Sequence, residues 1–435
     1  MTFRAPLIVL ALVVLSAPAF AGQKAAGDVT LKGDKPAAKR GAKTPLGHVL
    51  MHHLDMAVAI DAQSRGLVAQ GGAVASRYAT TRSISPGSPF VGGTQRNAVA
   101  GNLRHYNETE VEAGMPVWLP GQSEAMEATV TTGVAEIDER LAQRRLEVAG
   151  LLRDAWWNAQ RAARETSVAR NRVATAREIG ADMTRRVELG DAAQADALLA
   201  RNELLAAETE LAQAEGAEKV ARVNYEALTG GVPPDGILET VKPAGDIEDH
   251  PALRTPLAAL RRAEAQARLV EATPIDNPEI GVFGRKEHNR QYSTDPAQDM
   301  VTDQLTDATT VGVRFRIPLP TPGRNAPRQA EALAEMTRAQ ADYEKARRVV
   351  LAEIEAARAN FAAAKRAAAI ASQRLAVANE QFALTRKSFA LGEIGALDFY
   401  RIRQLQLEAQ RSQAAASVNV GAAASRLNQA QGYAP

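Results

Sequence analysis

The chain has no cysteine, and aromatic residues make up only 4% of its 435 residues. Without cysteine it can form no disulfide, and it can carry no acyl group on an N-terminal cysteine. Few aromatic side chains beside a hydrophobic fraction of 46% are more typical of long helices in close contact than of a large globular core. The formal net charge of +2 produces no strong field, so we expect no nucleic-acid partner.

Catalytic and cofactor motifs are also missing. The sequence has no phosphate-binding loop, serine elbow, zinc-protease motif or dinucleotide fingerprint, so we expect no enzyme activity and no cofactor. Histidine is scarce, and His48, His52 and His53 form a local cluster in which the first two suit one face of a helix. Because Asp55 is the one carboxylate beside them, we expect packing histidines rather than a metal site.

The N-terminus has the three parts of a secretory signal. Arg4 is followed by an apolar run at 7–16 and by a small-x-small site that ends at Ala21. We predict that residues 1–21 are a cleaved signal peptide and that 22–44 form a flexible tail. An uncleaved anchor is the alternative. Beyond this region no run reaches about 18 apolar residues, so a mature chain that crosses a membrane must use strands.

The second half of the chain repeats the first. Proline is absent from two long stretches, 121–232 and 328–434, and each follows a proline-marked strand end. The matching landmarks, at offsets of 200 and then 202 residues, are Leu119-Pro120 with Leu319-Pro320, Leu189-Gly190 with Leu391-Gly392, and Gly230 with Gly432. A constant offset over this length indicates a duplication.

Each copy is predicted to contain two strands and a long helical hairpin. Apolar and polar side chains alternate along 311–319 and, 200 residues earlier, along 111–119. The fold class is therefore mainly α with a small β part. The predicted boundaries are a first repeat at 45–232, with strands at about 73–82 and 104–118 and a hairpin at 123–229, a linker at 233–250, and a second repeat at 251–432, with strands at about 279–286 and 306–319 and a hairpin at 325–431.

Four strands from one chain are too few to close a barrel. Open sheet edges have no hydrogen-bond partner in lipid, and the smallest membrane barrels use about eight strands. Several chains must therefore each contribute a sheet if these strands enter a membrane. The alternative is a soluble four-stranded sheet at the end of a coiled-coil rod.

The duplicated unit, the proline-rich corners between strands and helices, and the Leu-Gly hairpin tips resemble the TolC family of outer-membrane efflux proteins. Three motifs are similar to its heavy-metal (CzcC-like) branch: Asn277-Pro278-Glu279-Ile280, Arg316-Ile317-Pro318-Leu319-Pro320 and Gly323-Arg324-Asn325. The resemblance covers roughly 45–432. It implies a homotrimer with a twelve-stranded β-barrel in the outer membrane and an α-helical barrel in the periplasm. It also implies a periplasmic adaptor and an inner-membrane pump as partners.

The hairpin tips are the first candidate site. Gly190 and Gly392 suit the left-handed turn that ends a helix, and this structural role alone would explain them. Leu189 and Leu391 add apolar side chains beside the turns. In the family such tips meet the adaptor, so we predict that these four residues dock it.

Two acidic residues form the second candidate site. Asp196 and Asp398 each lie six residues beyond a tip glycine. The resemblance places acidic residues at the periplasmic entrance, where threefold repetition makes a ring that attracts cations. A solvated helix charge is the alternative. The copies differ directly afterwards, with Ala197-Leu198 against Phe399-Tyr400, and Gly395 is present at one tip alone, so gating is expected here.

The predicted function is a passive duct, the outer-membrane channel of a tripartite efflux system, with heavy-metal cations as a candidate substrate. A periplasmic coiled-coil adaptor or scaffold is one alternative, and a type I secretion conduit is another. An adaptor has one helical hairpin between lipoyl-like and barrel modules. Two hairpins without such modules favour the duct.

Overall fold

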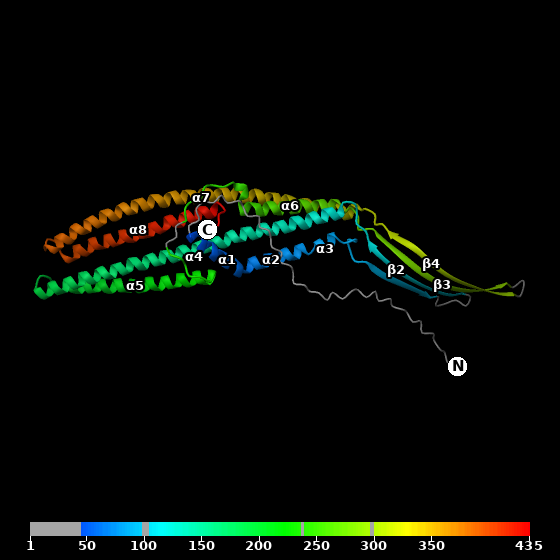
Figure 1. The fold of residues 1–435 in the computed structure, drawn as a ribbon, viewed down its shortest axis with the longest axis horizontal. Coiled ribbons are helices and arrows are strands. Elements are labelled where there is room, and N and C mark those ends of the chain that lie inside the picture. Colours follow the sequence, from blue (N-terminus) through cyan, green and yellow to red (C-terminus); the bar gives the residue numbers. More distant parts are fainter. Residues whose placement is uncertain (1–44, 98–103, 236–238, 296–299) are drawn as a thin grey trace, which may run out of the picture. The chain divides into compact units, whose positions relative to one another are not determined.

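The computed structural model describes residues 45–97, 104–235, 239–295 and 300–435. The predicted signal peptide and tail lie outside the described residues. Pro45–Pro435 forms one compact unit, and the prediction of a mainly helical chain with a small strand part is confirmed (Figure 1). In the described ranges, no helix combines the length and the apolar character needed to cross a membrane.

The two halves share one order of elements: short helix, two strands, long helix, return helix. The first half contains α1 (Pro45–Ile60), α2 (Ala62–Ala75), α3 (Tyr78–Thr81), β1 (Phe90–Asn97), β2 (Arg104–Pro116), α4 (Gln122–Leu189) and α5 (Gln194–Thr229). The second half contains a 3-10 turn, η1 (Ile247–Asp249), then α6 (Pro251–Glu271), β3 (Glu279–Asp295), β4 (Met300–Arg316), α7 (Pro322–Ala390) and α8 (Ala396–Ala430).

The predicted strand at about 73–82 is wrong. These residues lie in α2 and α3, and the first strand is β1, inside a stretch expected to be a loop. Val74 packs on α4, where a β-carbon at Gly133 would lie 3.1 Å from Val74 Cγ1. The apolar residues of this stretch therefore face a helix rather than alternate across a sheet. β3 and β4 also extend further than predicted, because their outer halves are polar and resemble loop sequence.

The strands form an antiparallel sheet in the order β1-β2-β3-β4, with two different faces. One face is apolar, and its members in register are Val91, Val111, Ala113, Met115, Ile280, Val282, Val311, Val313 and Phe315. Val91 and Val311 are 79% exposed. Along β3 the apolar-face residues are exposed, whereas the alternating residues of the polar face are half-buried. The sheet is therefore curled with its polar face on the inside.

The helices pack around α4, which contacts α2 and α5 of its own copy and α6 and α8 of the other. A core cluster forms where α1, α4 and α5 meet, with Leu54, Leu152 and Tyr225 fully buried. Each such side chain contributes about 1.5–3 kcal/mol through removal from water. On the α8 side, Trp157 donates from Nε1 to Ser425 Oγ at 2.8 Å, and its ring fills the space beside Gly421.

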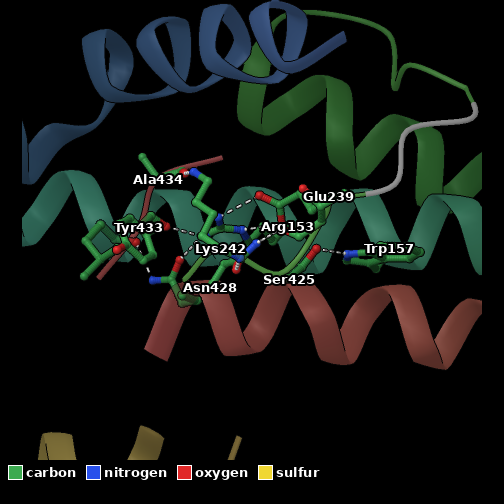
Figure 2. A network of polar contacts seen from close by, with 11 residues as sticks. Arg153, Trp157, Glu239, Lys242, Ser425, Asn428, Tyr433 and Ala434 are labelled. Carbon is green, nitrogen blue, oxygen red and sulfur yellow. Dashed lines mark hydrogen bonds and ion pairs between the residues drawn. The ribbon is translucent and has the colours of Figure 1, made fainter. Parts of the chain in front are cut away.

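A buried polar network ties the segment between the copies to α4 (Figure 2). Arg153 donates to both carboxylate oxygens of Glu239, at 3.0 and 2.8 Å, and to the carbonyl of Tyr433 at 2.9 Å. Lys242 donates from Nζ to the carbonyl of Ala434 at 2.6 Å, and burial lowers the pKa of its ammonium group. The network holds the linker and the last residues of the chain against the first copy.

Candidate functional site: the hairpin tips

The first tip is closed by a helix-ending motif around Gly190, which has φ of +80°. Gly190 N–H donates to the Val187 carbonyl at 3.1 Å, and Asp191 N–H donates to the Arg186 carbonyl at 2.8 Å. This pair of bonds satisfies carbonyls that the end of α4 would otherwise leave free. Glycine takes this left-handed conformation without a steric penalty.

The second tip has the same motif 202 residues later. Gly392 has φ of +77° and donates to the Phe389 carbonyl at 3.1 Å, while Glu393 N–H donates to the Ser388 carbonyl at 2.9 Å. The duplicated Leu-Gly landmarks are therefore duplicated turns. This supports the structural explanation of both glycines and does not test adaptor docking.

Replacing Gly190 or Gly392 by alanine is expected to destabilise its own tip by about 1 kcal/mol, because alanine pays a steric cost at positive φ. Amide hydrogen exchange should accelerate within the last turn of α4 or α7 and leave the opposite tip unchanged. Gly180→Ala is the matched control, since Gly180 lies inside α4 with open space around its Cα. Equal effects at all three glycines would contradict this explanation.

The tips also present apolar side chains to solvent. Leu189 is 70% exposed and Leu391 is 74% exposed. Two further exposed leucines near the starts of the return helices were not among the predicted docking residues, namely Leu198 at 58% and Leu397 at 75%. Their signal was available, since Leu198 lies eight residues and Leu397 five residues beyond the tip glycine of its own copy. Each tip thus carries a pair of exposed leucines.

An aromatic cluster joins the two tips within one chain. Phe399 stacks on Phe389 with ring centroids 4.6 Å apart, and Tyr400 meets Phe399 edge-on at 5.6 Å. Met183 of α4 and Ala200 of α5 are buried in the same cluster. The first copy has Ala197-Leu198 where the second has Phe399-Tyr400. Ala197 packs against this cluster, so the two aromatic residues of the second copy lie beside a small residue of the first.

The two aspartates are equivalent in sequence but not in surroundings. Each lies in the first turn of its return helix, where a negative charge is favourable. Asp398 is exposed and forms no ion pair or side-chain hydrogen bond with another described residue, whereas Asp196 is half-buried. Burial raises the pKa of Tyr400 to about 12, and the carboxylates of Glu203 and Asp196 add to this effect. Ala200, one turn further along the same face of α5, is buried in the cluster that contains Tyr400, so Asp196 lies on the side of α5 toward the other copy.

Above the tips, ion pairs continue the seam between the hairpins. Glu210 of α5 pairs with Arg172 of α4 and with Arg411 of α8. Gln404 of α8 donates to Glu203 of α5 at 3.1 Å. These contacts link the return helices of the two copies directly.

Of the three histidines in the predicted cluster, His53 has a packing role. The side chain of His48 lies outside the described residues, and His52 is exposed. His53 is buried, with Nδ1 2.7 Å from the Tyr225 hydroxyl. In the described part of the chain, no group of three or more His, Cys, Asp or Glu side chains is arranged to hold a metal ion.

A second buried histidine occupies the corresponding place in the other copy. His53 lies against Gly231, and His250 lies against Gly432, at the ends of α5 and α8 respectively. His250 Nδ1 accepts the Ala252 N–H at 3.1 Å and so caps α6. Burial lowers the pKa of both histidines, with His52 adding to the effect at His53. For His250, the Ala430 carbonyl and Glu353 oppose the shift.

The lowered pKa values predict a loss of stability in acid. Below pH 6.5 these histidines bind protons in the unfolded chain but remain neutral in the folded chain. The free energy of unfolding therefore decreases as the pH falls. Asparagine also caps helices but does not titrate, so His250→Asn should flatten this acid dependence in urea unfolding. The exposed His52→Asn is the control, and an unchanged slope in His250→Asn would contradict the assignment.

A family model described as "Outer membrane efflux protein" matches residues 92–231 and 247–433, which covers both copies. No curated protein matches the chain. Among solved structures, it is similar to the outer membrane protein VceC from Vibrio cholerae, with a TM-score of 0.65 and 15% identity over 88% of this chain and 96% of that one. The Campylobacter jejuni CmeC outer membrane channel has a TM-score of 0.67 and 14% identity, over 88% of this chain and 85% of that one. The open state of the Neisseria gonorrhoeae MtrE outer membrane channel has a TM-score of 0.63 and 18% identity, over 88% of each chain.

At these identities the solved structures show the shared fold, and the family model shows the membership. The match extends from the first strand to the last turn of α8, and it includes both hairpin tips. The resemblance found in the sequence is thereby confirmed at the level of the family, while the heavy-metal branch stays a prediction. The chain belongs to the outer membrane efflux protein family.

Proposed function

We propose that this chain is the outer-membrane channel of a tripartite efflux system and works as a homotrimer. The observation that carries the proposal is the exposed apolar face of the sheet, where Val311 is 79% and Phe315 is 74% exposed. In water such a face is unfavourable, but it suits contact with lipid. The polar, curled inner face would then line the passage.

The edges of the sheet and the open side of a long helix both favour an assembly of several chains. β1 and β4 are the edge strands of the sheet, and lipid tolerates no unpaired edge. Three four-stranded sheets would supply a twelve-stranded barrel. α7 packs on α6 and α8. Among the helices that the structure describes, it has no second pair of neighbours such as its counterpart α4 has, and Ile370 and Val377 on it are each 65% exposed. If the duplication holds in the trimer, α2 and α5 of the neighbouring chain cover that open side.

The identity of the exported substrate is the most specific part of the proposal. Heavy-metal cations are supported by the similarity of three motifs to the CzcC-like branch. One of these motifs also has a structural role, since Asn277 Nδ2 donates to the Val117 carbonyl at 3.0 Å and to Gln122, which ties the corners of the two copies. Export by a type I secretion system is the alternative within the family.

Fractionation of Gram-negative cells tests the proposal. The expected result is a protein without residues 1–21 in the outer-membrane fraction, as trimers that dissociate only on heating. A soluble periplasmic protein without such trimers would contradict it and favour a scaffold. For the adaptor partner, Leu391→Cys should cross-link to the adaptor hairpin, whereas Glu271→Cys, exposed on α6, should not.

At the periplasmic entrance we expect Asp398 to select cations. Repeated by threefold symmetry, this exposed carboxylate forms a ring that attracts cations and repels anions. Asp398→Asn should lower the cation-to-anion permeability ratio in planar bilayers. Asp196→Asn should do so less, because Asp196 faces Tyr400 in the seam. An unchanged ratio in Asp398→Asn would assign the residue to the helix N-terminus alone.

A further inference from the structure

Carboxylates on the inner face of the sheet are covered by arginines. Glu110 of β2 lies opposite Arg285 of β3 in the strand register. Arg285 donates to Glu110 Oε2 from Nε at 3.0 Å and from Nη2 at 2.8 Å, and it also reaches Glu108 Oε1 at 3.0 Å. The side chains of Glu108 and Glu110 are only 4% and 9% exposed. Two acids on a sheet surface are thus almost removed from solvent.

A second arginine reaches these acids from two strands away. Arg314 lies on β4 opposite Gly281 of β3, yet its guanidinium pairs with Glu110 and Glu112 on β2. Gly281 has no side chain to block this path, and a β-carbon there would lie 2.8 Å from the Ala113 carbonyl oxygen. Glu110 is therefore the shared partner of two guanidinium groups that come from different strands.

The network is layered, with acids beneath and cations above. The side chains of Arg285 and Arg314 are 35% and 45% exposed, several times more than that of Glu110. Both guanidiniums also lie over the Phe283 ring, at 5.8 and 5.2 Å from its centroid. A solute at this face meets guanidinium edges whose charge is balanced by carboxylates just below.

We propose that Glu110 sets the ion preference of the strand-built part of the channel by neutralising Arg285 and Arg314. This inference rests on the proposed function, in which the inner face of the sheet lines the passage. Arg96 of β1 also pairs with Glu108, at 3.6 Å, so this network contains three carboxylates and three guanidiniums. With Glu110 charged, the collar formed by the network is therefore close to neutral and passes cations that Asp398 has admitted. Without that charge, Arg285 keeps Glu108 and Arg314 keeps Glu112. Each chain then has one uncompensated positive charge, so the collar attracts anions and repels cations.

Permeability ratios in planar bilayers test the inference. Glu110→Gln should shift the cation-to-anion ratio toward anions, roughly twofold for each uncompensated charge near the ion path and less at high salt. Arg314→Gln should shift the ratio toward cations. The double variant, which removes one charge of each sign, should return close to wild type. Glu271→Gln, an exposed glutamate on α6, is the matched control and should leave the ratio unchanged.

The outcomes distinguish a failure of the proposed channel function from a failure of the role given to Glu110. A wild-type protein that forms no channel overturns the proposed function, and this inference with it. A conducting wild type whose ratio is unaffected by Glu110→Gln overturns the inference alone. If Glu110→Gln does not assemble, Arg314→Gln decides, and the absence of a cation shift in that variant overturns the inference.

Discussion

Gly421→Ala is expected to lower the free energy of unfolding by about 3 kcal/mol, the upper end for overpacking a tight interior. A β-carbon at this position would lie 2.0 Å from Trp157 Cη2, far inside any allowed contact. The indole cannot retreat without breaking its 2.8 Å hydrogen bond to Ser425. The strain therefore acts on the packing of α4 against α8, which joins the two copies.

Gly216→Ala is the matched control for this prediction. Gly216 lies inside α5, the counterpart of α8, with open space where a β-carbon would project. The same substitution should stabilise there by about 0.5–1 kcal/mol, because alanine is the better helix former. Thermal unfolding followed by circular dichroism measures both. Adding Trp157→Leu to Gly421→Ala should recover part of the loss, and equal behaviour of the two glycines would contradict the packing account.

Arg153→Met is expected to cost about 3–5 kcal/mol, the range for removing one partner of a buried ion pair. The side chains of Arg153 and Glu239 are 3% and 9% exposed, so the remaining buried carboxylate would lose its hydrogen-bonded counter-charge and keep only a longer-range attraction to Lys242. The carbonyl of Tyr433 would also lose its donor. The linker between the copies and the chain end should then detach from α4, which faster hydrogen exchange at 239–242 would report.

An exposed pair gives the comparison for Arg153. Arg177 and Glu208 are joined at a similar distance, 2.8 Å, but are 65% and 39% exposed. Arg177→Met should therefore cost no more than about 1 kcal/mol. In the double variant Arg153→Met with Glu239→Gln, much of the loss should be recovered because the buried carboxylate no longer carries a charge. Similar losses for Arg153→Met and Arg177→Met would contradict the role given to burial.

The sequence predicted those features whose signal is local and repeated. The long helices were recognisable because proline is absent from α4 and from α7 beyond Pro327, and the tips because Leu-Gly recurs at a fixed offset. β1 was missed because its sequence, FVGGTQRN, has few apolar residues to alternate. The stretch at 73–82 was misassigned because Val74 contacts Gly133, a partner about 60 residues away that no local pattern reveals.

The candidate site was predictable in position but not in its asymmetry. Gly190 and Gly392 prove alike, since each turn depends on its own helix end. Asp196 and Asp398 differ because Asp196 is half-buried on the side of α5 toward the Phe399-Tyr400 cluster, whereas Asp398 is exposed, and packing of this kind depends on contacts between copies. The pairing of Arg314 with Glu110 was equally beyond a sequence pattern, because it depends on strand register and on the missing side chain of Gly281.

Single-channel recording on purified trimers in a planar lipid bilayer tests the central claim most directly. If three chains enclose one water-filled passage, each inserted trimer should give one uniform conductance step rather than three independent ones. Asp398→Asn should change its ion selectivity while leaving insertion intact. Stable trimers that insert without conducting, or chains that stay soluble and monomeric, would contradict the account.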